Sequence, residues 1–106
     1  AELAPFLNAA VGDASQLILE MGAYRVAPGA ESQNWHRDNP VRDSRIVAMQ
    51  IALSDTQAEQ GALEVAPGSH RDLQDELPHA VTAEVVQGSV VFYSPFISHR
   101  GRANRL

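Results

Sequence analysis

The sequence predicts a mainly β fold of the jelly-roll class, a double-stranded β-helix like that of the cupins, with a short N-terminal helix. Short apolar segments alternate with turns rich in Gly, Pro, Asn and Asp, as in small β sandwiches and barrels. Helical spacing is found only over residues 2–10, where Leu3, Phe6, Leu7 and Ala10 recur on one side. The rest of the chain is expected to form strands and turns.

The expected strands are short, and turn residues separate them. The segment at residues 45–53 is apolar enough to predict a strand that is buried on both faces. Polar residues 54–61 indicate a loop, and residues 71–78 indicate a charged surface excursion. Roughly seven strands are expected in all. Those with the clearest pattern cover residues 17–26, 45–53, 62–66, 81–86 and 89–93.

Composition limits the chemistry. The 106 residues are 44% hydrophobic and 20% charged, as is ordinary for one soluble globular domain. The chain has no Cys, so any metal must be held by nitrogen and oxygen ligands. All 8 basic residues are Arg, which excludes Schiff-base lysines and a P-loop. The formal charge of -5 argues against nucleic acid and anionic lipid as partners.

The sequence shows no pattern of a membrane-spanning segment or a signal peptide. None of its apolar runs approaches the roughly 18 residues that cross a bilayer. The first ten residues, AELAPFLNAA, lack the basic and apolar regions of a signal peptide. We therefore expect a cytoplasmic protein.

Candidate metal ligands lie among the histidines. His36 and Asp38 are two residues apart, so on an extended segment both side chains point to one face and could share a cation. Alone, such a pair beside a turn is weak evidence of function. His99 follows the apolar segment SVVFYSPFIS, where an imidazole is unfavourable unless something binds it. His79 is expected to be solvated, and His70 to fasten a turn.

Two histidines and one carboxylate that leave other positions open form the facial triad suited to Fe(II) and oxygen activation. Two other interpretations stay open. A structural zinc ion could tie the sheets together, although such sites usually have four protein ligands and often Cys. A non-catalytic cupin-like domain could use the same fold to bind a metal, a sugar or a partner.

Four blocks in order resemble the phytanoyl-CoA dioxygenase family of Fe(II)- and 2-oxoglutarate-dependent oxygenases. They span residues 24–104 and read PGAESQNWHRD, MQIALSDTQAEQGALEVAPGSH, QGSVVFYSPFISH and HRGRAN. The resemblance implies a jelly roll in which His36, Asp38 and His99 bind iron. It also implies that Gln33 contacts 2-oxoglutarate, the cosubstrate used together with O₂.

The activity implied by the resemblance is hydroxylation of a small organic substrate, coupled to oxidative decarboxylation of 2-oxoglutarate. Related halogenases lack the carboxylate at the position of Asp38, so its presence favours hydroxylation. Family members hold the distal carboxylate of 2-oxoglutarate with an Arg on the order of ten residues past the distal His. Since only residues 100–106 follow His99, Arg102 and Arg105 are the substitute candidates. We expect residues 1–106 to form a single jelly-roll oxygenase domain, incomplete at the C-terminus and with loops missing from the numbering.

Overall fold

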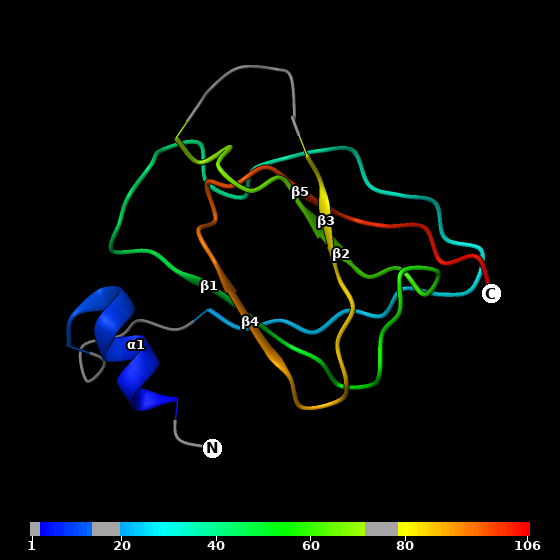
Figure 1. Cartoon of the computed structure of the whole chain (residues 1–106), viewed down its shortest axis with the longest axis horizontal. Coiled ribbons are helices and arrows are strands. Elements are labelled where there is room, and N and C mark those ends of the chain that lie inside the picture. The colour runs from blue at the N-terminus through cyan, green and yellow to red at the C-terminus, as the bar shows by residue number, and fades with distance from the viewer. Residues whose placement is uncertain (1–2, 14–19, 72–78) are drawn as a thin grey trace.

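The computed structural model describes residues 3–13, 20–71 and 79–106, and its regular secondary structure is one short helix and several short strands joined by loops (Figure 1). The strands form two antiparallel sheets, one with the order β1-β4 and one with the order β3-β2-β5. The predicted mainly β fold with one short N-terminal helix is confirmed. In chain order the elements are α1 (Ala4–Val11), β1 (Ala48–Ile51), β2 (Leu63–Val65), β3 (Val81–Ala83), β4 (Val90–Tyr93) and β5 (His99–Gly101).

Helix α1 begins at Ala4, close to the predicted start of the helix. Pro5 lies in its first turn, where a missing N–H breaks no intrahelical hydrogen bond. Gly12 ends the helix with a φ of 89°, and its N–H donates to the carbonyl of Asn8 at 2.9 Å. Over the described ranges, no helix has the length and apolar character needed to cross a membrane.

The register of β1 and β4 decides which side chains face the rest of the molecule. Ala48 pairs with Tyr93, and Gln50 pairs with Val91. Directly paired residues point to the same face, so these four side chains share one face of the sheet. On the opposite face, the ring of Phe92 stacks on Phe6 of α1 with centroids 6.3 Å apart. Gln50 and Tyr93 therefore lie on the face away from α1.

In the β3-β2-β5 sheet the register likewise decides which side chains share a face. Val65 of β2 pairs with His99 of β5, and Glu64 pairs with Arg100. His99 therefore points to one face, while Glu64 and Arg100 share the other. The ring of Tyr93 on β4 contacts the ring of His99, with centroids 5.1 Å apart. The two sheets thus meet at His99.

The strand predicted over residues 45–53 is shorter and more exposed than expected. It is β1, and on the face toward α1 Met49 is 37% exposed and Ile51 47% exposed. Leu53, just beyond the strand, is 72% exposed. The prediction of burial on both faces is therefore wrong, because in the described part of the chain α1 covers only a fraction of this face. The buried hydrophobic residues within the described ranges are Ala62, Ala66 and Phe96.

The strand predicted over residues 17–26 is not found. Its first part, residues 17–19, lies outside the described residues, and residues 20–26 carry no strand hydrogen-bonding pattern. Met21 is 86% exposed and Tyr24 75% exposed, because no described strand pairs with this segment. The other predicted strands are confirmed in shortened form as β2, β3 and β4, so the described residues hold five strands rather than seven. Beyond Arg71, the charged excursion at residues 71–78 lies outside the described residues.

Gly61 holds the loop before β2 against the segment that precedes His36 and Asp38. Its φ is +83°, and a Cβ there would lie 2.6 Å from Cγ1 of Val26 and 3.2 Å from the carbonyl oxygen of Arg102. We expect Gly61→Ala to lower the free energy of unfolding by about 1–3 kcal/mol, from strain and overpacking together. Gly88 has the same φ of +83° but no heavy atom within 4 Å of such a Cβ. Urea unfolding should therefore show a smaller loss for Gly88→Ala; equal losses would contradict the close approach.

Candidate metal centre

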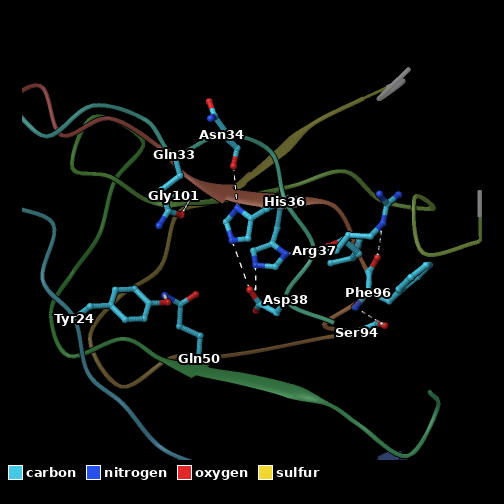
Figure 2. Close-up of polar contacts among 12 residues, drawn as sticks. Tyr24, Gln33, Asn34, His36, Arg37, Asp38, Gln50, Ser94, Phe96 and Gly101 are labelled. Carbon is cyan, nitrogen blue, oxygen red and sulfur yellow. Dashed lines mark hydrogen bonds and ion pairs between the residues drawn. The ribbon is translucent and has the colours of Figure 1, made fainter. Parts of the chain in front are cut away.

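Backbone pairing brings His36 and His99 side by side. Each donates its N–H to the carbonyl of the other at 3.0 Å, which forms an antiparallel bridge. Asp38 then donates its N–H to the carbonyl of Pro95, also at 3.0 Å. Two segments far apart in the sequence thus bring His36, Asp38 and His99 together. Figure 2 shows the imidazole of His36 beside the carboxylate of Asp38.

The three side chains are close enough to share one ion. One ligand atom from each lies within 4.8 Å of the others. Oδ1 of Asp38 is 3.5 Å from Nε2 of His36, and Oδ2 is 3.3 Å from Nε2 of His99. Ligands about 2.1 Å from one ion and at right angles to each other are about 3 Å apart. The two distances from Asp38 to the imidazoles therefore fit adjacent ligands of one metal ion after a small adjustment.

Backbone carbonyls fix the orientation of both imidazoles. Nδ1 of His36 lies 2.8 Å from the carbonyl oxygen of Asn34, and Nδ1 of His99 lies 2.9 Å from that of Ile97. A carbonyl can only accept, so the hydrogen-bonding pattern assigns the proton to Nδ1 in both rings. The lone pair then resides on Nε2, which faces Asp38 and is the atom that a metal would take.

Burial differs across the site. The side chain of His99 is 5% exposed, whereas those of His36 and Asp38 are 39% and 51% exposed. One ligand is therefore set firmly into the fold, while the other two border solvent. Small molecules can approach the group from this open side.

Arg37, between His36 and Asp38, anchors their segment to the loop that leads into β5. Its Nε donates to the carbonyl of Phe96 at 2.9 Å, and its guanidinium lies 5.2 Å from the centroid of the Phe96 ring. A second nitrogen donates to the carbonyl of Ser69 at 3.1 Å. The hydroxyl of Ser69 in turn accepts from the N–H of Ser98, next to His99. These bonds fix the position of the segment that carries His36 and Asp38 relative to the segment that carries His99.

The residues predicted to contact 2-oxoglutarate occupy different places. Gln33 lies beside β5, where its Oε1 accepts from the N–H of Gly101 at 2.8 Å. Arg102 donates to Oε1 of Glu64 at 3.2 Å and to the hydroxyl of Thr82 at 3.1 Å, on the sheet face opposite His99. Nε of Arg105 lies 3.7 Å from a carboxylate oxygen of Glu59. The structure thus brings Gln33 near the triad and turns Arg102 away from it.

Three further polar residues belong to this region, and the sequence did not single them out. Gln50 donates to the hydroxyl of Tyr24 at 3.3 Å (Figure 2). The ring of Tyr93 contacts the ring of His99. Burial raises the pKa of Tyr93 to about 12, with smaller contributions from nearby Tyr24 and Asp38. Tyr93 is therefore a neutral phenol at physiological pH. A signal for Gln50 did exist, because it is the polar residue within the apolar run IVAMQIAL.

Comparison with known proteins gives one family match that covers nearly the whole chain. The model of the family described as phytanoyl-CoA dioxygenase (PhyH) matches residues 4–105. A curated relative, "Dioxygenase aneA" of Aspergillus aculeatus, is 33% identical over 97 residues. That match covers 76% of this chain and 33% of the relative. The chain thus spans about a third of the length of this relative.

Two solved structures share the fold. AviO1 from Streptomyces viridochromogenes Tue57 superposes with a TM-score of 0.64 at 29% identity, covering 76% of this chain and 40% of AviO1. EvdMO1 gives a TM-score of 0.65 at 27% identity, covering 76% of this chain and 22% of EvdMO1. Dioxygenases of this kind have a jelly-roll fold, so the predicted fold class is confirmed.

Proposed function

Because the chain belongs to the phytanoyl-CoA dioxygenase family, we propose that it carries the metal centre of an oxygenase that uses Fe(II) and 2-oxoglutarate to hydroxylate a small organic substrate. The observation that supports this most strongly is the convergence of His36, Asp38 and His99 within 4.8 Å. The proposal treats residues 1–106 as one oxygenase domain. The proposal concerns the activity of the whole protein, and this chain spans 33% of the length of the curated relative.

The donor set favours iron over a structural zinc ion. Two imidazoles and one carboxylate are the ligands of non-haem Fe(II) oxygenases, whereas structural zinc usually has four protein ligands and often thiolates. The group formed by the described residues has three members, and two of them border solvent. Such a site leaves coordination positions free for small molecules.

Iron, when bound, would activate dioxygen. In the overall reaction, 2-oxoglutarate, O₂ and a substrate C–H give succinate, CO₂ and the hydroxylated product. One oxygen atom of O₂ ends in succinate and the other in the product. The side chains of this chain supply geometry and charge. The carbonyls of Asn34 and Ile97 keep both Nε2 lone pairs directed at the ion. Asp38 adds a negative charge that offsets part of the charge of the cation.

For the cosubstrate, Gln33 is the contact that the geometry favours within this chain. Its Oε1 is committed to the N–H of Gly101, which leaves Nε2 of the same amide to donate to a carboxylate. Arg102 and Arg105 are weaker candidates, because Glu64 and Glu59 already engage them. We therefore assign Gln33 first and the two arginines second.

The placement of Arg102 favours a second candidate function. Arg102 donates to Glu64 and Thr82, and a domain in which it does so could bind a metal in the same fold without turning over 2-oxoglutarate. In that case it would be a non-catalytic cupin-like binding domain. The two candidates differ in their affinity for 2-oxoglutarate, which the oxygenase must bind and the binding domain need not.

The direct test is succinate release in air. We expect succinate when the protein receives both Fe(II) and 2-oxoglutarate, and none when either is omitted. Zn(II) in place of iron should give none, because zinc has no redox chemistry. Equal succinate release without iron would contradict the proposal. Tight iron binding with no detectable affinity for 2-oxoglutarate would support the binding domain instead.

A further inference from the structure

We propose that three arginines and a serine form a binding site for a phosphate group, on the side of the β3-β2-β5 sheet that faces away from the metal triad. The site, which we call the arginine hollow, has a volume of about 90 Å³. That is several times the roughly 10–15 Å³ needed to hold one water molecule. It is lined by Ser32, Arg100, Arg102, Ala103 and Arg105. This proposal does not depend on the proposed function.

The arginine hollow lies across the sheet from His99. Arg100 pairs with Glu64 between β5 and β2, so these two side chains share the face opposite His99. Arg102 also reaches Glu64, at 3.2 Å, and therefore points to the same face. A group bound by Arg100 and Arg102 is thus separated by the sheet from the imidazole that would hold the metal.

The polar side chains of the hollow offer hydrogen-bond donors. A guanidinium carries five N–H groups and no acceptor. Within the described ranges, Arg102 uses one nitrogen, Nη1, for its hydrogen bonds to Glu64 and Thr82. Oγ of Ser32 accepts from the N–H of Ala103 at 2.8 Å, which leaves the hydroxyl proton for a ligand. The hollow therefore suits a group that only accepts.

Two of the guanidiniums are held in place and still border solvent. Nε of Arg100 donates to Glu64 at 2.7 Å, and its guanidinium lies 4.6 Å from the centroid of the Trp35 ring. The side chains of Arg100 and Arg102 are 31% and 29% exposed, and that of Arg105 is 71% exposed. A ligand can therefore reach all three arginines. Because two of them are already ordered, binding costs less conformational entropy.

The charges around the hollow favour an anion. Its three guanidiniums are paired with two carboxylates, those of Glu64 and Glu59. Among these five groups one positive charge is in excess, although the whole chain has a formal charge of -5. A positive hollow on an acidic protein raises the local concentration of anions. The ligand is therefore expected to be negatively charged.

A phosphate group matches this arrangement better than a carboxylate does. A carboxylate has two oxygens in one plane, which the fork of a single guanidinium can serve. A phosphate monoester has three terminal oxygens and a charge of about −1.5 to −2 at pH 7. It can therefore accept from several guanidiniums and from the serine hydroxyl at once. Free phosphate and a phosphate monoester share this chemistry, and their affinities distinguish them.

The test compares four anions by titration calorimetry at constant ionic strength: inorganic phosphate, methyl phosphate, acetate and 2-oxoglutarate. The protein is used without added iron, because phosphate and 2-oxoglutarate also bind Fe(II). We expect the better of the two phosphate ligands to bind at least about tenfold more tightly than acetate, a difference of about 1.4 kcal/mol. Tighter binding of methyl phosphate would identify an ester as the ligand, and tighter binding of inorganic phosphate would identify the free ion. Acetate binding as tightly as phosphate, or no binding of either phosphate ligand, would overturn the proposal.

Variants then locate the bound phosphate. Arg105→Gln removes a charge from the most exposed of the three arginines, and we expect it to lower the affinity for the better phosphate ligand about fivefold or more. Arg45→Gln removes the same charge from an arginine that is 85% exposed and pairs with Asp43, outside the hollow. It should change the affinity by less than about twofold, because exposed charges at a distance are screened. Ser32→Ala provides a second test, with an expected loss of about threefold. Equal losses in Arg105→Gln and Arg45→Gln would show that net charge alone is the cause and would overturn the site.

Trp35 provides a local signal for binding. It is the only tryptophan of the chain, and the guanidinium of Arg100 lies over its ring. We expect the better phosphate ligand to change the tryptophan emission with the same midpoint as in calorimetry. Acetate at the same ionic strength and concentration should leave the emission unchanged. A midpoint that differs from the calorimetric one would place the phosphate elsewhere and contradict the site.

The outcomes separate this site from the proposed oxygenase. Failure of phosphate to bind removes the site and leaves the oxygenase function intact, because no residue of the triad lines the hollow. A different result would assign the hollow to the cosubstrate. If 2-oxoglutarate displaces phosphate and loses the same affinity in Arg105→Gln, the proposal of a separate phosphate site is overturned.

Discussion

Alanine in place of Asp38 is expected to lower the affinity for Fe(II) by at least about 100-fold and to abolish succinate formation. Changes around metal ligands typically cost 10–100-fold, and loss of a ligand removes more. Asp38 is the anionic member of the group, and its two oxygens lie 3.5 and 3.3 Å from the imidazole nitrogens of His36 and His99. Without it, two imidazoles remain to hold a dication. Anaerobic titration with Fe(II) measures the affinity for iron, and a succinate assay in air then measures turnover.

Asp43 provides the matched control for this substitution. It lies on the same connecting segment, and its carboxylate pairs with Arg45 at 2.7 Å rather than with the triad. Asp43→Ala should therefore leave iron affinity and succinate formation near the wild-type values. Wild-type iron affinity in Asp38→Ala would contradict the assignment of the carboxylate as a ligand, whatever the control shows.

Leucine in place of Glu64 is expected to lower the free energy of unfolding by about 2–4 kcal/mol. The side chain of Glu64 is 9% exposed and accepts from Arg100 at 2.7 Å and from Arg102 at 3.2 Å. Removal of one partner from a buried ion pair costs about 3–5 kcal/mol, because the other charge is left unpaired. The two arginines are 31% and 29% exposed, so water offsets part of this loss. Urea unfolding measures the effect.

Two other variants define the cause. Glu64→Gln keeps the shape and hydrogen-bonding capacity, so it should lose less than Glu64→Leu. Glu59→Leu removes an exposed partner that lies 3.7 Å from Arg105, and such surface pairs contribute about 0–1 kcal/mol. Equal destabilisation by Glu59→Leu and Glu64→Leu would show that burial of the pair is not the cause.

The ion pair between Glu64 and Arg102 also explains why Arg102, a candidate contact of 2-oxoglutarate, does not point toward the triad. His99 and Arg102 are three positions apart, and neighbouring residues along a strand alternate between faces. An Arg at that spacing therefore points to the opposite face, where Glu64 engages it. The alternation of side chains along a strand could have shown the direction of Arg102 from the sequence. That argument first requires knowing that residues 99–101 form a strand.

The triad was predictable because the spacing of His36 and Asp38, the position of His99 and the family resemblance of the blocks around them can all be read in the sequence. His36 and Asp38 are two residues apart, and His99 follows an apolar segment, so both features are visible in the printed sequence. The hydrogen bond between Gln50 and Tyr24 was not predictable, although Gln50 stands out as the polar residue of its apolar run. It depends on the register between β1 and β4 and on the path of a segment without strand pairing, and neither can be derived from residue pattern alone.

The exposure of β1 shows a further limit of sequence reasoning. A continuous apolar run indicates a strand, yet the run does not tell which element covers each face. Met49 and Ile51 were expected to be buried and are 37% and 47% exposed. Strand formation depends mostly on the apolar run itself, so the strand was predicted correctly. Burial depends on contacts between distant segments, so the exposure of its side chains was not.

A crystal structure of the protein grown with Fe(II) under anaerobic conditions, with anomalous data at the iron edge, tests the metal assignment most directly. We predict one strong peak about 2.0–2.2 Å from Nε2 of His36, Nε2 of His99 and a carboxylate oxygen of Asp38, with no fourth protein ligand. A peak bound elsewhere, or an ion enclosed by four protein ligands, would contradict an open three-residue iron site.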